Sequence, residues 1–192
     1  MPGAPAQHLM APAGRNISDL QAENLVGAKT AAVLALFYEQ NSTAHLVLTL
    51  RKSYKGVHSN QISFPGGKRD KTDVDYLQTA LREAEEEIGI SSTNVDVYGQ
   101  LSPLYIPPSN FLVHPFVGIY NSKPHFTKQE SEVEEIFSVT VDELLDDSFI
   151  TNVTLNLRGV NMEVPTFLFK GYNVWGATAM MLSELRQILL LQ

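Results

Sequence analysis

The stretch SFPGGKRDKTDVDYLQTALREAEEEIGI, residues 63–90, decides how the rest of the chain is interpreted. Its second half predicts a helix that ends at Gly89, because glycine readily adopts the conformation that closes a helix. Like charges three or four residues apart on a helix repel one another. Four glutamates nevertheless fall within five positions of this helix: Glu83, Glu85, Glu86 and Glu87. The pattern indicates that a cation from outside the chain completes the segment.

The predicted helix separates into two kinds of side chain when its residues are placed at about 100° per position. The apolar stripe consists of Leu77, Ala80, Leu81, Ala84 and Ile88. We expect Glu83, Glu86 and Glu87 together on the opposite, exposed side. Carboxylate oxygens suit a hard cation such as Mg²⁺, which shares its remaining positions with water and substrate phosphates. A solvated acidic face is the alternative, and the loop with Gly66 and Gly67 before the helix favours Mg²⁺ or Mn²⁺.

Length and charge limit the class of protein. A chain of 192 residues with 44% hydrophobic content can bury a core, and we expect one domain over residues 15–192. The net charge of -7, from 14 basic and 21 acidic residues, argues against nucleic acid or an anionic membrane as the main partner. The absence of cysteine excludes a disulfide framework and thiol catalysis.

The start of the chain and its apolar runs indicate a cytoplasmic protein. No apolar run reaches the roughly 20 residues that a membrane-spanning helix needs. Residues 1–14 lack the basic and apolar regions of a signal peptide, and their Pro, Gly and Ala content predicts a flexible or extended tail. We expect a soluble protein that acts on a small molecule, and a homodimer is left open.

The pattern along the rest of the chain predicts an α/β fold. Apolar, β-branched runs predict strands over residues 30–39, 44–51, 94–101 and 111–120. A further hairpin is expected over 149–170, turning at Arg158 and Gly159, and residues 63–73 read as a loop. Helices are expected over 140–147, with Thr140 as the cap, and over 174–191. Strands mixed with three helices favour a sheet covered on both faces.

Residues 67–90 resemble the Nudix box, which runs Gly, five residues, Glu, seven residues, and then Arg-Glu-apolar-x-Glu-Glu-x-Gly-apolar. The second half fits position by position from Arg82 to Ile90. In the first half, Asp73 stands where Glu is expected and one extra residue separates it from Arg82. This lengthening, with Asp70 and Asp73 after the glycine pair, is similar to the coenzyme A pyrophosphatase branch of the Nudix hydrolases.

Two further blocks are similar to that branch. Residues 48–67, LTLRKSYKGVHSNQISFPGG, resemble its Leu-Thr-x-Arg followed by His-x-Gly-Gln-Val-Ser-Phe-Pro-Gly-Gly, and residues 172–179, YNVWGATA, resemble its Tyr-x-x-Trp-Gly-x-Thr-Ala. Lys52, Gly56 and Asn60 depart from the first pattern, where Ser or Ala, Arg, and Gly are usual. The departures bear on how the phosphates or the pantetheine arm are held, and they leave the glutamate helix untouched.

The resemblance implies a Nudix-type α/β/α sandwich with a mixed sheet, and it assigns roles on the helix. Glu83, Glu86 and Glu87 would ligate Mg²⁺ or Mn²⁺, with one of them acting as the base or orienting it. Gly67 would lend a backbone carbonyl to a metal ion. Arg82 would pair with a carboxylate and fix its rotamer.

A further glutamate is expected from a later loop, as in many Nudix enzymes. The segment KQESEVEEIF offers Glu130, Glu132, Glu134 and Glu135. We select Glu132 as a catalytic residue because it directly precedes Val133, which leads into an apolar pair. A solvated run of charges is the alternative interpretation of this segment.

Candidate substrate contacts lie around the glycine pair. Arg51 and His58 are expected to contact the adenosine or the 3'-phosphate, and Gln61 belongs to the same block. Lys68, followed by Arg69, would neutralise phosphate oxygens. The alternative for Arg51 and His58 is structural hydrogen bonding in the loop, and for Lys68 and Arg69 it is charge balance beside an acidic site.

The resemblance implies hydrolysis of a nucleotide diphosphate linkage, with coenzyme A or a thioester cleaved to 3',5'-ADP and 4'-phosphopantetheine. Attack by water on a phosphorus surrounded by anionic oxygens requires charge neutralisation and positioning, which metal ions and carboxylates supply. One alternative is a Nudix hydrolase of ADP-ribose or of dinucleoside polyphosphates. Another is a non-catalytic Nudix-fold binding module, although such a module usually lacks the intact Arg-Glu-x-x-Glu-Glu set.

Overall fold

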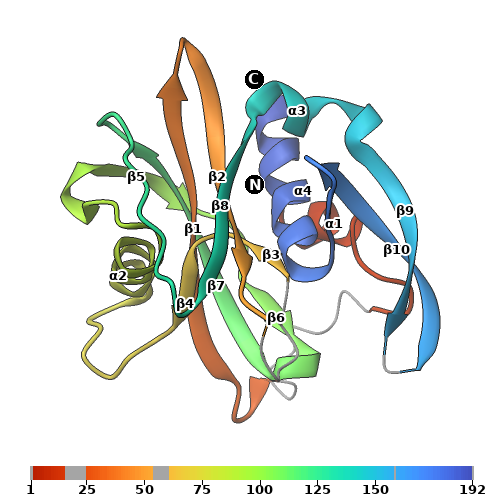
Figure 1. Ribbon diagram of the computed structural model, residues 1–192. Coiled ribbons are helices and arrows are strands. Elements are labelled where there is room, and N and C mark those ends of the chain that lie inside the picture. Colours follow the sequence, from red (N-terminus) through yellow and green to blue (C-terminus); the bar gives the residue numbers. More distant parts are fainter. Residues whose placement is uncertain (1, 16–24, 54–60, 158, 192) are drawn as a thin grey trace.

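A mixed sheet forms the centre of the computed structural model, which describes residues 2–15, 25–53, 61–157 and 159–191 (Figure 1). Within these residues the sheet has eight strands, and its main order is β3-β2-β1-β7-β5, with β4 on β1, β6 on β7 and β8 on β2. Only β1 and β7 pair in parallel among the described pairs. The strands are β1 (Lys29–Gln40), β2 (Thr43–Arg51), β3 (Ile62–Ser63), β4 (Gly66–Lys68), β5 (Val95–Gln100), β6 (Leu104–Ile106), β7 (Phe111–Tyr120) and β8 (Val133–Thr140).

Helices cover both faces of this sheet, as expected from the sequence. Helix α2 (Tyr76–Ile88) packs on one face and α4 (Gly176–Leu190) on the other (Figure 1). Side chains alternate along β1 because successive residues of a strand point to opposite faces. Ala32 and Leu34 belong to a hydrophobic cluster that contains residues of α2. Ala31 and Ala35 belong to a second cluster, which contains residues of α4. The prediction of an α/β fold with a mixed sheet is confirmed.

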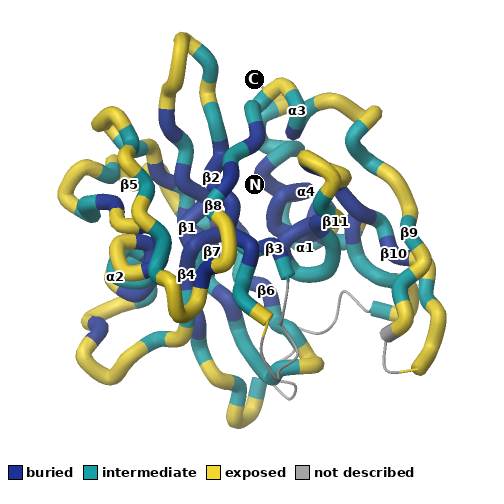
Figure 2. The backbone as a smooth tube through the Cα atoms, viewed as in Figure 1, coloured by how far each residue is buried: buried dark blue, intermediate teal, exposed yellow. Residues whose placement is uncertain are grey.

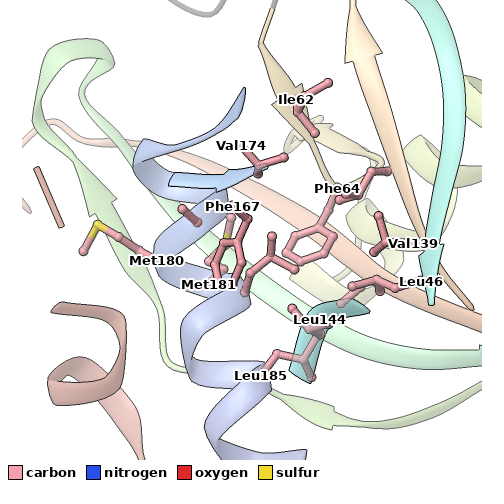
Figure 3. Packing of buried hydrophobic residues seen from close by; sticks show 14 of the residues in the cluster. Leu46, Ile62, Phe64, Val139, Leu144, Phe167, Val174, Met180, Met181 and Leu185 are labelled. Carbon is pink, nitrogen blue, oxygen red and sulfur yellow. The ribbon is translucent and has the colours of Figure 1, made fainter. Parts of the chain in front are cut away.

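A second, three-stranded sheet lies beyond α4. It consists of β9 (Ile150–Leu157), β10 (Val160–Phe169) and β11 (Tyr172–Val174), in the order β11-β10-β9. The pairing of Val160 with Leu157 confirms the predicted hairpin. Phe64, Phe167 and Leu144 belong to one buried cluster beside α4 (Figure 3). The predicted closing helix starts two residues too early, because Tyr172–Val174 pairs with β10 as a strand.

The prediction of an extended tail is wrong for the first residues of the chain. Gly3–His8 form helix α1, which packs beside α4 (Figure 1). Ala6 and Gln7 are 5% and 2% exposed, and Ser183 of α4 donates a hydrogen bond to the Ala6 carbonyl at 2.7 Å. Among the described helices, none is long and apolar enough to cross a membrane.

Shorter elements complete the fold. The predicted cap at Thr140 is confirmed, since it begins α3 (Val141–Leu145) in a reciprocal capping box with Glu143. The 3₁₀ turns η3 (Ser92–Asn94), η4 (Pro107–Ser109) and η5 (Asp147–Phe149) connect larger elements. Residues 63–73 were expected to be a loop, but they contain the end of β3 and all of β4. Figure 2 shows the middle of β1 and β2 largely buried, whereas β5, the end of the β1–β2 hairpin and much of β9 are exposed.

Candidate active site

Helix α2 is fixed at both ends by its own sequence. Asp75 caps the start, and its side chain accepts a hydrogen bond from the Gln78 backbone at 2.7 Å. Gly89 closes the end with a left-handed φ of 72°, and its N–H donates to Glu85. Ala80 and Ala84 are fully buried, and small side chains there let the helix lie close to β1 and β4. The helix therefore carries its glutamates on a rigid support.

The expectation that Glu83, Glu86 and Glu87 share an exposed face is wrong for two of them. The exposed fractions of these side chains are 15%, 51% and 2%, respectively. Glu87 follows Ala80 by seven positions, and residues seven apart on an α-helix lie only about 20° apart around its axis. Glu87 therefore belongs to the packed stripe, Glu83 lies at its border and Glu86 faces outward.

Glu87 is buried, and two described groups, the Gly66 N–H and Arg51, stabilise its charge. The Gly66 N–H donates to its Oε2 atom at 2.9 Å, and Arg51 Nη1 lies 3.3 Å from its Oε1 atom. Burial raises the pKa of Glu87 to about 7, even though Gly66 and Arg51 act in the opposite direction. The negative charges of Glu83 and Glu132 add to this increase.

The glycine pair lies directly against these carboxylates. Gly66 and Gly67 belong to β4, which pairs with residues 31–33 of β1. A Cβ atom on Gly67 would approach the Oε2 atom of Glu83 to 2.3 Å, and one on Gly66 would approach the Ala32 carbonyl to 2.4 Å. Real Cβ atoms do not come this close, so Gly66 requires glycine because backbone atoms surround it, and a side chain at Gly67 would displace the Glu83 carboxylate. Gly67, expected to contribute a backbone carbonyl, thus lies beside Glu83.

Arg82 connects three carboxylates. It holds Asp73 with two hydrogen bonds, from Nε at 2.9 Å and from Nη2 at 3.0 Å. It also donates to Glu83 at 3.0 Å and to Glu86 at 3.1 Å. The hydrogen bonds from Arg82 hold the pKa of Asp73 well below its usual range, and Asp73 in turn raises the pKa of Arg82. The expected pairing of Arg82 with carboxylates is thus present in the fold.

Asp73 has a structural role that sequence reasoning did not identify. Its side chain also accepts hydrogen bonds from the Asp70 backbone at 2.8 Å and from the Thr79 hydroxyl at 2.9 Å. It therefore ties the loop before α2 to the helix and to Arg82. The sequence signal was its place in the box, where an acidic residue was expected.

Glu132 lies at the entrance to β8, close to the buried carboxylates. Its backbone carbonyl accepts from the Lys52 N–H at 2.8 Å, and Lys52 follows Arg51 in the chain. The side chain of Glu132 is exposed, yet its charge raises the pKa values of both Glu83 and Glu87. The fold thus brings this later residue to the glutamates of α2.

The remaining candidate contacts are less uniform. Lys68 is exposed, and its carbonyl accepts from Arg82 at 3.3 Å, so it borders the carboxylates. Gln61 is half-buried, and its carbonyl accepts from the Arg51 N–H at 3.0 Å. His58 lies outside the described residues. Arg69 turns away, because its Nη2 donates to the carbonyls of residues 73 and 74, and its guanidinium lies 5.0 Å from the ring centre of Tyr76.

The part of the chain that builds this site matches a known protein family. The family model described as the NUDIX domain matches residues 28–155, which include β1 to β8 and α2. The chain belongs to the Nudix family. A Yersinia enterocolitica protein named "Uncharacterized Nudix hydrolase NudL" is 38% identical to this Nudix protein over 142 residues, or 74% of this chain and 72% of the relative. A Yersinia pestis protein of the same name is 35% identical over 142 residues, or 74% and 71% of the two chains.

Solved structures agree on the fold of this Nudix protein. A Nudix hydrolase from M. smegmatis, RenU, superposes with a TM-score of 0.59 at 16% identity, covering 85% of this chain and 87% of that one. A MutT protein from Methanosarcina mazei gives 0.56 at 16% identity, covering 85% and 96%. Identities this low establish the shared fold and nothing about substrate.

The Nudix site has the chemistry that a hard divalent cation requires. Among the described residues, no group of three or more acidic or histidine side chains is already arranged around a metal position. The reason is local, since Arg82 pairs with Glu83 and Glu86, and Glu87 faces the Gly66 N–H. The available donors are carboxylate and carbonyl oxygens, which suit Mg²⁺ or Mn²⁺. Buried carboxylates that repel one another, beside a glycine cradle, fit such an ion.

Proposed function

We propose that this Nudix protein hydrolyses the diphosphate linkage of coenzyme A or of its thioesters, yielding 3',5'-ADP and 4'-phosphopantetheine. The observation that carries the hydrolase proposal is the buried Glu87. Its raised pKa, its neighbours Glu83 and Glu132, and the glycines of β4 form an anionic site in which Arg51 is the one cation paired with Glu87 among the described residues. Such frustration is typical of functional sites rather than of structural ion pairs.

The residues of the site would divide the chemistry among them. Glu83, Glu86, Glu87 and the Gly67 carbonyl would hold Mg²⁺ or Mn²⁺, which would neutralise the phosphate oxygens and orient water when bound. Glu132, which is exposed, would accept the proton from the attacking water. Arg82 would keep Glu83 and Glu86 in place from the side anchored by Asp73. Lys68 and Arg51 would attract the anionic substrate to the rim of the site.

The coenzyme A preference rests on the resemblance of the blocks at residues 48–67 and 172–179 to that branch. Their placement supports a common task, because Thr178 Oγ1 donates to the Ile62 carbonyl at 2.9 Å and β3 pairs with β2 at Thr49 and Leu50. Tyr172 reaches the neighbouring strand β8, where its hydroxyl donates to Glu135. We also propose that the protein acts in the cytoplasm.

A product analysis over a substrate panel tests the proposal. Coenzyme A, dephospho-coenzyme A, ADP-ribose and a dinucleoside polyphosphate would each be incubated with Mg²⁺ and with Mn²⁺. We expect the highest kcat/KM for coenzyme A, a lower value without the 3'-phosphate, and cleavage within the diphosphate alone. In ¹⁸O-water one phosphate product would carry the label.

Each other outcome has a separate meaning. Preference for ADP-ribose would contradict the substrate class and leave the hydrolase intact. Release of inorganic phosphate or cysteamine from coenzyme A would indicate a phosphomonoesterase or an amidase. Binding of the panel without turnover would identify a binding module.

A further inference from the structure

The segment between β7 and β8 is attached to the end of α2 through its backbone. The Thr127 N–H donates to the Ile88 carbonyl at 3.0 Å, and the Gln129 N–H donates to the Glu87 carbonyl at 3.0 Å. The last carbonyls of a helix have no partner within the helix, so these two bonds cap α2 from outside. Figure 1 shows this segment running along α2 before it enters β8.

A single residue connects that cap to Glu132. The Gln129 carbonyl accepts hydrogen bonds from the Glu132 N–H at 3.1 Å and from the Val133 N–H at 2.9 Å. The Glu132 carbonyl is held in turn by the Lys52 N–H at 2.8 Å. Gln129 thus binds α2 with its N–H and the backbone of Glu132 with its carbonyl. A displacement of Gln129 from α2 would move Glu132 as well.

Gly89 is what allows the segment to approach so closely. Its φ of 72° is left-handed, and a Cβ atom there would lie 2.9 Å from Thr127 Cβ, 3.0 Å from its carbonyl oxygen and 3.2 Å from its nitrogen. Two of these three atoms are backbone, so no rotation of a side chain relieves the contact. Gly171 provides the contrast, because it has a φ of +83° and a Cβ atom added there would meet nothing within 4 Å.

We propose that Gly89 is a positioning residue for Glu132: it lets residues 127–129 lie against the end of α2, and this contact fixes Glu132 relative to Glu83 and Glu87. The inference rests on the proposed function and deepens it. It gives the box glycine a task beyond ending the helix, namely to set where the later loop delivers its carboxylate.

The test is a double-mutant cycle with a matched control. Gly89→Ala adds both the left-handed strain and the contact with Thr127, whereas Gly171→Ala adds the strain alone. On the best substrate we expect Gly89→Ala to lower kcat at least about tenfold, with KM within about threefold, and Gly171→Ala to retain wild-type kcat. In a Glu132→Gln background, Gly89→Ala should cost less than about twofold more, because variants that act through one residue are not additive.

Amide hydrogen exchange supplies a readout that is independent of turnover. Gly89→Ala should reduce the protection of the Gln129 and Glu132 amides at least about tenfold, while Gly171→Ala leaves both unchanged. If Gly89→Ala does not fold, Gly89→Asn serves instead, since asparagine tolerates the left-handed region but still carries a Cβ atom.

The outcomes separate the two claims. Equal losses from Gly89→Ala with and without Glu132 would overturn the positioning role, as would unchanged protection at Gln129 and Glu132. A wild-type protein that hydrolyses nothing, but in which Gly89→Ala releases those amides, would contradict the proposed function and leave the positional coupling standing.

Discussion

Two buried glutamates, Glu184 and Glu87, lie on opposite faces of the central sheet, and they differ in the groups that stabilise their charges. Glu184 of α4 is fully buried, and its carboxylate accepts hydrogen bonds from Gln7 Nε2 at 2.8 Å and from the Ser102 hydroxyl at 2.8 Å. The Ser102 N–H adds contacts at 3.1 and 3.2 Å. These donors are neutral, and they come from α1 and from the segment between β5 and β6. This carboxylate holds three parts of the fold together.

Glu87 of α2 is as deeply buried but less well supplied. Within the described part of the chain, its partners are the Gly66 backbone N–H and one cation, Arg51, at 3.3 Å. Glu83 and Glu132 repel it, and burial raises its pKa to about 7. A buried carboxylate that stabilises the fold, such as Glu184, accepts hydrogen bonds from several donors. A buried carboxylate in a functional site, such as Glu87, destabilises the folded state until a ligand binds. This contrast favours the carboxylates around Glu87, and not Glu184, as the candidate site.

The largest expected effect comes from removing the charge of Glu87. Glu87→Gln should lower kcat at least about a hundredfold, because it replaces an anionic oxygen at the reacting centre with a neutral group of similar shape. The same change should leave the fold intact and raise the urea midpoint in metal-free buffer above pH 7, where the buried charge is present. Steady-state kinetics and urea titration measure the two effects.

Glu85→Gln is the matched control for this variant. Glu85 lies on the same helix, is exposed, and accepts a hydrogen bond from Ser92 at 2.9 Å outside the site. It removes the same charge from α2, so its kcat should remain within about twofold of wild type. A similar loss in both variants would show that the effect reflects the charge of the helix and not the position of Glu87.

Much of this arrangement could be predicted from local patterns. The strands β1, β2 and β7 are long apolar runs, and α2 has both a periodic stripe and Gly89 at its end. The burial of Glu87 was available from the same helical geometry, since it follows Ala80 by seven positions. The error came from grouping the three glutamates by charge when their angles differed.

Other features had no local signal, because tertiary contacts decide them. The segment of α1 contains glycine and proline, which disfavour a helix, and it is held by α4 through Ser183 and Glu184. Strand β4 is mostly glycine and forms only because β1 pairs with it. Strand β8 begins in a run of glutamates that reads as a loop. Its pairing with β2 from His45 to Arg51 was not visible in the sequence.

A smaller effect, on stability alone, is expected at Glu184. Glu184→Gln places an amide N–H₂ where donors from Gln7 and Ser102 already converge, and a buried donor without an acceptor costs about 1–3 kcal/mol of unfolding free energy. The kcat should stay within about twofold of wild type. Glu163→Gln, at an exposed position of β10, is the control and should change neither quantity. If Glu184→Gln lowered kcat without lowering stability, Glu184 would not be the purely structural glutamate that its contacts indicate.

The smallest effect is expected at Asp73, whose contribution depends on pH. Its pKa lies below the ordinary value of 3.8 in the folded state because Arg82 donates to it. A lowered pKa means that the unfolded chain binds more protons, so this stabilisation is complete above pH 3.8 and is lost as the pH falls through the folded value.

Asp73→Asn should lower the unfolding free energy by about 1 kcal/mol at pH 7, because Arg82 is partly exposed and keeps its ion pairs with Glu83 and Glu86. Urea titrations between pH 7 and 2 should show the difference from wild type shrinking as the pH falls, whereas Asp147→Asn, at an ion pair with an 87% exposed aspartate, should show none. A difference that stayed constant down to pH 2 would mean that Asp73 acts through its shape and not through its charge.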